Sequence, residues 1–156
     1  MYGAKLSRPK GGFAEPLDHL IGTNSAVFNI GDVVDITSGF LSVLGATSDR
    51  PFGICKQKVT MASDNQTVAK VLVPFVPLEN SMEFEMDLDE DGALANVGQF
   101  FTFTTGGTGV QTIDFSSASD TVGQVVLVKL DPRGEGSVTR GLFRVALPEM
   151  AFEPET

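Results

Sequence analysis

Short apolar runs separated by turn residues recur along the chain from Ala26 onward. The clearest run is 81–88, where methionine, phenylalanine and leucine alternate with acidic residues. This period of two predicts a β-strand with one buried and one charged face. The run 122–130 is almost continuously apolar, which is typical of a strand in the centre of a sheet. No window shows the 3.6-residue period of an amphipathic helix.

About ten short runs of this kind predict an all-β fold, a sandwich or barrel with jelly-roll-like character. We assign this β domain to residues 26–147 and an acidic tail to residues 148–156. Residues 1–25 show neither strand nor helix periodicity, and their basic residues all precede the first acid, Glu15. They predict an extended N-terminal arm, which either docks on a neighbouring subunit or is a disordered terminus.

Two segments of the chain, 31–53 and 98–123, share an order of features. Each begins with glycine, continues through a strand to a threonine-containing end, and reaches a second glycine near the start of a later strand. Two related β units would explain the similarity. Coincidence in a chain rich in glycine, valine and threonine would explain it as well.

Charge and cysteine content narrow the class of partner and the compartment. The 156 residues carry a formal charge of −9 and a sequence pI of about 4.4, which opposes binding to nucleic acid or to an anionic membrane. Cys55 is the single cysteine, so no intrachain disulfide can form. No apolar stretch approaches the ~20 residues that span a bilayer. No signal segment is visible, so we expect the protein to be made in the cytoplasm and used without export.

Candidate catalytic groups are few. A hydrolase triad would have to use His19, the one histidine, and no Gly-x-Ser-x-Gly turn accompanies it. Cys55 lies in an apolar run, where a cysteine usually packs as a small hydrophobic residue. One cysteine and one histidine do not make a zinc site. We therefore expect no enzyme activity and no cofactor.

Asp87, Asp89 and Asp91, followed by Gly92, match the first half of a calcium-binding loop. The match ends at position twelve, where Gly98 replaces the expected glutamate. The segment is either a solvated acidic turn or a weak calcium site. Seven of the 20 acidic residues lie between positions 79 and 91 with no basic residue among them, so this tract is either a solvating surface or a docking patch for a basic partner.

Four segments together resemble the capsid decoration (cement) proteins of tailed bacteriophages, over residues 20–147. They are Gly31-Asp32-Val33-Val34, Pro51-Phe52-Gly53-Ile54-Cys55, Val122-Gly123-Gln124-Val125-Val126 and Gly141-Leu142-Phe143-Arg144-Val145. The resemblance implies a small β-rich virion protein on the outer surface of an icosahedral capsid. Its partner would be the major capsid protein, and it would form homotrimers or sometimes dimers.

The resemblance also implies an N-terminal arm that reaches across capsomers. The residues that we expect to contact the capsid or a neighbouring subunit are Lys5, Arg8, Lys10 and Phe13. A tail-tube or head–tail connector component is an alternative, for which hexameric rings are expected. A small ligand- or carbohydrate-binding β module is another, although the chain has no tryptophan and one tyrosine with which to stack on sugars.

Overall fold

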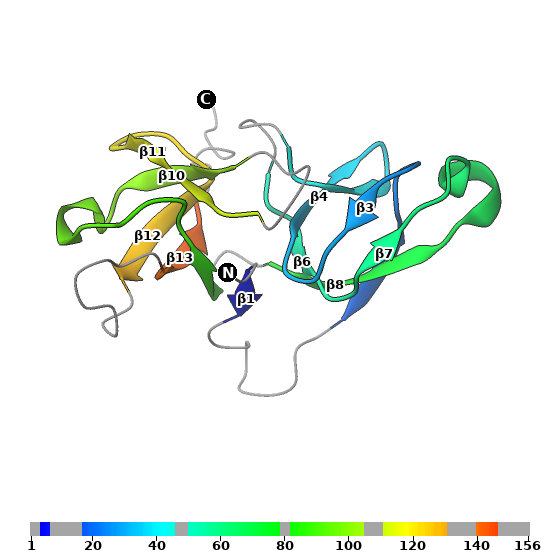
Figure 1. The fold of residues 1–156 in the computed structure, drawn as a ribbon, viewed down its shortest axis with the longest axis horizontal. Helices are drawn as coiled ribbons and strands as arrows, with labels where there is room; N and C mark the ends of the chain where they lie inside the picture. Colours follow the sequence, from blue (N-terminus) through cyan, green and yellow to red (C-terminus); the bar gives the residue numbers. More distant parts are fainter. Residues whose placement is uncertain are drawn as a thin grey trace, which may run out of the picture.

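The structure is a computed structural model that describes residues 4–6, 17–45, 50–78, 82–104, 111–130 and 140–146. The expected all-β fold is confirmed: strands dominate the described residues, and the helical elements are two short turns, η2 (Asn65–Ala69) and η3 (Leu94–Asn96). Within these ranges no helix is long and apolar enough to cross a bilayer. The strands form two units that lie side by side along the long axis of the molecule (Figure 1). Each unit is a small five-stranded barrel, and we call them the first and the second barrel in chain order.

The first barrel is a five-stranded sheet whose outer strands are joined to each other. Its strands lie in the order β2 (Asp18–Ile21), β8 (Leu72–Pro77), β6 (Gly53–Cys55), β4 (Val33–Thr37) and β5 (Phe40–Val43). A parallel bridge between Gly22 and Leu41 connects the end of β2 to β5, so the sheet curves round on itself. A small antiparallel pair, β3 (Val27–Phe28) and β7 (Val59–Thr60), belongs to the same half of the chain.

The second barrel has the same topology. Its strands lie in the order β9 (Glu83–Asp87), β13 (Arg140–Val145), β12 (Val125–Leu130), β10 (Phe100–Phe103) and β11 (Ile113–Ser119). In both barrels the first strand in the chain therefore neighbours the fifth, and the fifth is followed by the fourth, second and third. A parallel bridge between Leu88 and Ile113 joins β9 to β11, as Gly22 and Leu41 join β2 to β5. The short strand β1 (Lys5–Leu6) pairs with the free side of β9.

The bonds at the closing bridge are the same in the two barrels. The Thr23 N–H donates to the Leu41 carbonyl over 2.9 Å, and the Asp89 N–H donates to the Ile113 carbonyl over 3.0 Å. Each donor follows directly on the residue that forms the parallel bridge. The two units therefore agree in register and not only in strand order.

The same agreement holds where the second and fourth strands meet. The Gly31 N–H donates to the Cys55 carbonyl and the Gly98 N–H to the Leu127 carbonyl, both over 2.8 Å. Gly31 and Gly98 have φ angles of 90° and 96°, a conformation that glycine adopts without strain. Of the two explanations left open by the sequence, two related β units is therefore the one that fits. The second pair of glycines is not equivalent. Gly53 pairs with Val34, and the residue that pairs with Phe101, the counterpart of Val34, is Val125 and not Gly123.

Equivalent positions fill the inside of both barrels with apolar side chains. The pairs, first barrel first, are Leu20 and Met86, Val34 and Phe101, Leu41 and Ile113, Cys55 and Leu127, Val73 and Gly141, and Phe75 and Phe143. In the first barrel they form a core cluster with Phe28 and Met61. In the second they belong to a larger cluster that also includes Val33, Leu44, Ile54 and Val76 from the first barrel. The core of the second barrel thus continues into the first.

Two equivalent pairs exchange size. Cys55 and Val73 in the first barrel correspond to Leu127 and Gly141 in the second, so a larger side chain on one strand is matched by a smaller one on the next. A Cβ atom on Gly141 would lie 2.7 Å from Leu127 Cδ1. Gly141 therefore makes the space that Leu127 fills, so that a smaller residue on one strand accompanies a larger one on the next.

The first part of the chain differs from the expected arm over 1–25. Residues 18–21 form β2 in the wall of the first barrel, paired with β8 from Asp18↔Phe75 to Ile21↔Leu72. The backbone of Lys5–Leu6 extends the second sheet at β9. The first barrel therefore begins before residue 25. The pattern of Asp18–Ile21 does not predict this strand, because its first two residues are polar. The acidic tail, 148–156, lies outside the described residues.

Candidate interaction surfaces

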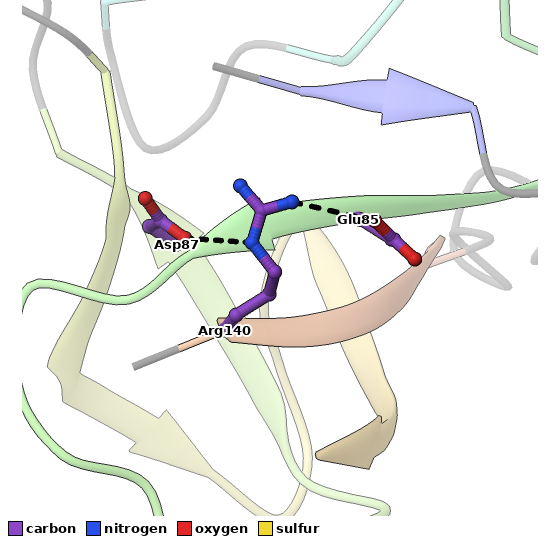
Figure 2. A network of polar contacts seen from close by, with 3 residues as sticks. All are labelled: Glu85, Asp87 and Arg140. Atoms are coloured by element: carbon purple, nitrogen blue, oxygen red, sulfur yellow. Dashed lines mark hydrogen bonds and ion pairs between the residues drawn. The ribbon is translucent and has the colours of Figure 1, made fainter. Parts of the chain in front are cut away.

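The outer surface of β9 and β13 carries an ordered array of charges. Arg140 on β13 donates through Nε to Asp87 Oδ1 at 3.0 Å and through Nη1 to Glu85 Oε2 at 3.3 Å (Figure 2). Further along, Arg144 donates through Nη2 to Glu83 Oε2 at 2.9 Å. The alternation expected for 81–88 is confirmed: acidic residues share this outer face, and Phe84, Met86 and Leu88 are buried on the other.

These pairs change the interpretation of the acidic tract. Its three carboxylates on β9 are paired with two arginines that lie more than fifty positions later in the chain, so the strand portion is not a uniformly negative patch. Asp89, Glu90 and Asp91 follow β9 and are exposed. A docking patch for a basic partner, one of the two alternatives, is therefore confined to this loop among the described residues.

The structure does not bring the predicted calcium ligands together. Asp87 is bonded to Arg140, and Asp89 Oδ1 accepts the Phe115 N–H over 2.8 Å. Across the described ranges, no group of three histidine, cysteine, aspartate or glutamate side chains is placed to hold a metal ion. The spacing of Asp87, Asp89 and Asp91 was misleading because a β-strand end and a turn separate the carboxylates instead of wrapping them around one point.

His19 and Cys55 lie on opposite sides of the barrel wall. His19 is exposed on β2, and its backbone N–H donates to Asp18 Oδ1. Cys55 is fully buried in the first core, where burial raises the pKa of its thiol and Sγ donates to the Gln57 carbonyl over 3.0 Å. Cys55 therefore packs as a small apolar residue, as its neighbours in the sequence predict.

A shallow depression of about 390 Å³ opens on the first barrel beside β4 and β5. Its lining includes Asn29, Asp32 and Ser42. Asp32 is almost completely buried and accepts the Asn29 N–H over 2.9 Å, while Ser42 donates to Asp35. Burial raises the pKa of Asp32. Asp32 and Ser42 in the lining of this depression thus each have a partner within the first barrel.

Exposed apolar side chains gather around the two helical turns. Val68, in η2, is 70% exposed, and Val71 and Leu72 beside it are also exposed. Leu94, in η3, is 82% exposed and lies close in sequence to exposed Val97. The two turns lie at opposite ends of the long axis (Figure 1). Apolar groups at separated points are suited to contacts with large partners rather than with one small ligand.

A buried glutamine joins the two barrels. Gln111 Oε1 accepts the Val33 N–H over 2.8 Å, and Gln111 Nε2 donates to the Leu44 carbonyl over 3.2 Å. Both contacts cross from the second barrel to the first. Because breaking them would leave buried backbone groups unsatisfied, they hold the barrels in one orientation. Neither Gln111 nor Arg140 stands out in the sequence, since the partners of each are distant in the chain.

Most of the residues predicted to contact the capsid lie outside the residues that the structure describes. Lys5 lies in β1, where its backbone pairs with Glu85. Arg8, Lys10 and Phe13 lie outside the described residues. Their role in contacts with a shell stays a prediction.

No protein-family model matches the chain, and the curated proteins searched contain no match to it.

Proposed function

We propose that this protein is a virion structural protein that decorates and stabilises an icosahedral phage capsid by bridging subunits of the major capsid protein. The observation that carries the proposal is the two-barrel body, in which a shared core and Gln111 fix the barrels to each other. A bridge between capsomers must resist outward pressure from a packaged genome. A rigid body with apolar side chains at both ends can contact two capsomers at once, so that weak contacts sum to firm attachment.

The remaining parts of the proposal follow from this role. The protein would act as a homotrimer, or as a dimer, on the outer capsid surface after synthesis in the host cytoplasm. The acidic balance of the chain favours solubility at the high concentrations of assembly and disfavours binding to the genome. A tail-tube or connector role would require hexameric rings, so the mass of the purified assembly separates the alternatives.

Co-sedimentation with empty capsid shells tests the proposal. The full chain is expected to sediment with shells, and a chain lacking residues 1–15 to sediment less. Leu94→Asp and Val68→Asp place a charge at the two exposed ends and are expected to reduce occupancy at least about tenfold. Ile30→Asp is the matched control, because Ile30 is 64% exposed and lies between β3 and β4, in neither helical turn. Absence of binding by the full chain, or equal occupancy for all variants, would overturn the proposal.

A further inference from the structure

One outer face of the first barrel is sealed by the second barrel. Val33, Ile54 and Val76 lie in one row across β4, β6 and β8, where Val33 pairs with Ile54 and Ile54 with Val76. All three are at most 2% exposed. They belong to the core cluster of the second barrel and not to that of the first, so their side chains point outward. We call this row the covered face.

The part of the second barrel that seals this face is one of its open ends. Phe84, at the start of β9, is fully buried, and Phe103, at the end of β10, is 5% exposed. Both belong to the cluster that contains the covered face, and Gln111 from the same end bonds to β4 and to Leu44. An end of one barrel thus packs on the side of the other.

The second barrel has its own counterpart of the covered face. Phe100 pairs with Val126 and Val126 with Arg144, as Val33 pairs with Ile54 and Ile54 with Val76. Phe100 and Val126 are half-buried and Arg144 is exposed. Leu142, also half-buried, lies in the next row beside exposed Lys129. We call these residues the receiving face. It is apolar in the middle, and its margin carries Lys129 and the ion pair between Arg144 and Glu83.

The first barrel has a counterpart of the sealing end. Ile36 occupies the position of Phe103, because Ile36 pairs with Leu41 as Phe103 pairs with Ile113. Ile36 is 40% exposed, against 5% for Phe103. Asp18 occupies the position of Phe84 and is exposed as well.

Two aromatic residues complete this end of the first barrel. Phe40 begins β5 beside Thr37 and is half-buried, and Phe52, which precedes β6, is 39% exposed. We call Asp18, Ile36, Phe40 and Phe52 the inserting end.

We infer that a second copy of this chain packs its inserting end on the receiving face, and so repeats between molecules the contact that the two barrels make within one. The occupant follows from the repeat: the described residues show what covers a face of this topology, namely the end of another barrel. Charge supports the pairing, since exposed Asp18 at the inserting end would meet exposed Lys129 at the receiving face. Arg144 at the same face is already paired with Glu83 and adds little to this attraction.

Contacts of this kind are heterologous, because each copy uses two different surfaces. Repetition of one rotation closes into a ring or continues as an open chain. Three copies would give a ring of six barrels, in agreement with the trimer in the proposed function. The inference deepens that part of the proposal, but it needs no shell. It is tested on the isolated protein, so it can fail while shell binding holds, and the reverse.

Sedimentation of three full-length proteins tests the inference. The wild-type chain is expected to be an oligomer. Val126→Asp damages the receiving face alone and Ile36→Asp the inserting end alone, so each is expected to be monomeric. An equimolar mixture is expected to form dimers, because each variant retains one intact surface and the two are complementary. Val68→Asp and Leu94→Asp serve as controls and should keep the wild-type mass.

Thermal melting establishes that each variant folds. If Val126→Asp does not fold, Leu142→Ser replaces it on the receiving face, and Ile36→Ser replaces Ile36→Asp at the inserting end. A monomeric wild type at about 100 μM, far above a Kd in the range of typical stable complexes, would overturn the inference. A folded variant with the wild-type mass would overturn it too, as would a mixture that stays monomeric.

Discussion

Arg140 illustrates how one residue can change the character of a surface. It lies between Glu85 and Asp87 in the outer row of the second barrel and is mostly shielded from water (Figure 2). Asp87 is 8% exposed, so its charge has little access to solvent. A charge in that position depends on its oppositely charged neighbour, because removal of one partner leaves the desolvation cost of the other.

Replacement of Arg140 by methionine is expected to destabilise the protein strongly. The change keeps apolar volume but removes the guanidinium from Asp87 and Glu85, at a cost of about 3 kcal/mol in the free energy of unfolding. Arg144→Met is the control, because the Arg144 side chain is 48% exposed and its pair with Glu83 should contribute less than about 1 kcal/mol. Urea denaturation measures both. Equal losses for the two variants would contradict this account of Arg140.

Asp32 should make stability depend on pH in the opposite sense to a paired carboxylate. Burial raises the pKa of Asp32 in the folded protein above its usual value of 3.8. Between the unfolded and the folded pKa the native state binds more protons than the unfolded chain, so this group's contribution to stability falls as pH rises. Above the folded pKa the buried charge opposes folding in full.

Asp32→Asn removes this charge and keeps an oxygen that can accept the Asn29 N–H. The stability of the variant relative to wild type is therefore expected to rise from pH 4 to pH 7. Urea denaturation at both values measures it, with exposed Asp64→Asn as the control. A relative stability that is the same at both pH values would show that burial of Asp32 has no such effect.

For a single residue, the sequence pattern predicts whether the side chain is buried but not which residue it contacts. The alternation in 81–88 predicts correctly which side chains of β9 are buried, because burial depends on local period. The partners of its acids cannot be predicted in the same way. Arg140 reaches Glu85 only because β13 pairs with β9, and strand pairing over such a separation is not encoded in either segment alone.

Among the elements, the exchange of size between equivalent strands offers a direct test of the repeat. Gly141→Val alone places a side chain against Leu127 and is expected to cost about 1–3 kcal/mol through overpacking. Leu127→Cys alone leaves a cavity and is expected to cost about 2–3 kcal/mol.

The double variant reproduces the Cys55 and Val73 combination of the first barrel. Its loss is expected to be smaller than the sum of the single losses by at least about 1 kcal/mol, because the new valine fills the space left by the leucine. Denaturation under reducing conditions measures all three proteins. Additive losses would mean that the two positions do not share one space.

The repeat itself was visible in the sequence only as a similar order of features. The strands and the first glycine pair could be found, since each depends on local pattern and on the φ angle of a turn. The full correspondence could not, because the loops between equivalent strands differ in length and the inner residues differ in size. The correspondence is established by the strand register. The carbonyl groups of Leu41 and Ile113 accept equivalent hydrogen bonds at the closing bridges of the two barrels.

At the scale of the whole molecule, the two barrels are unequal partners. The first has an inner core of its own, whereas the core of the second extends over the covered face. The sequence predicts one β domain over 26–147. Within this range the structure describes two barrels, with one core cluster inside the first and a second cluster that spans the contact between them. The sequence does not predict that the two barrels have equivalent outer faces, of which one is covered within the molecule and the other is exposed. This equivalence depends on the strand topology, which local pattern does not reveal.

The continuous core also bears on how the protein melts. Tandem repeats that touch weakly can lose their structure one after the other, with a separate heat absorption for each. In this protein, unfolding of the second barrel would expose the covered face, namely Val33, Ile54 and Val76, to water. The first barrel would then lose the stabilisation that comes from burial of this face. Differential scanning calorimetry of the monomeric Val126→Asp variant should therefore record a single peak whose van't Hoff and calorimetric enthalpies agree.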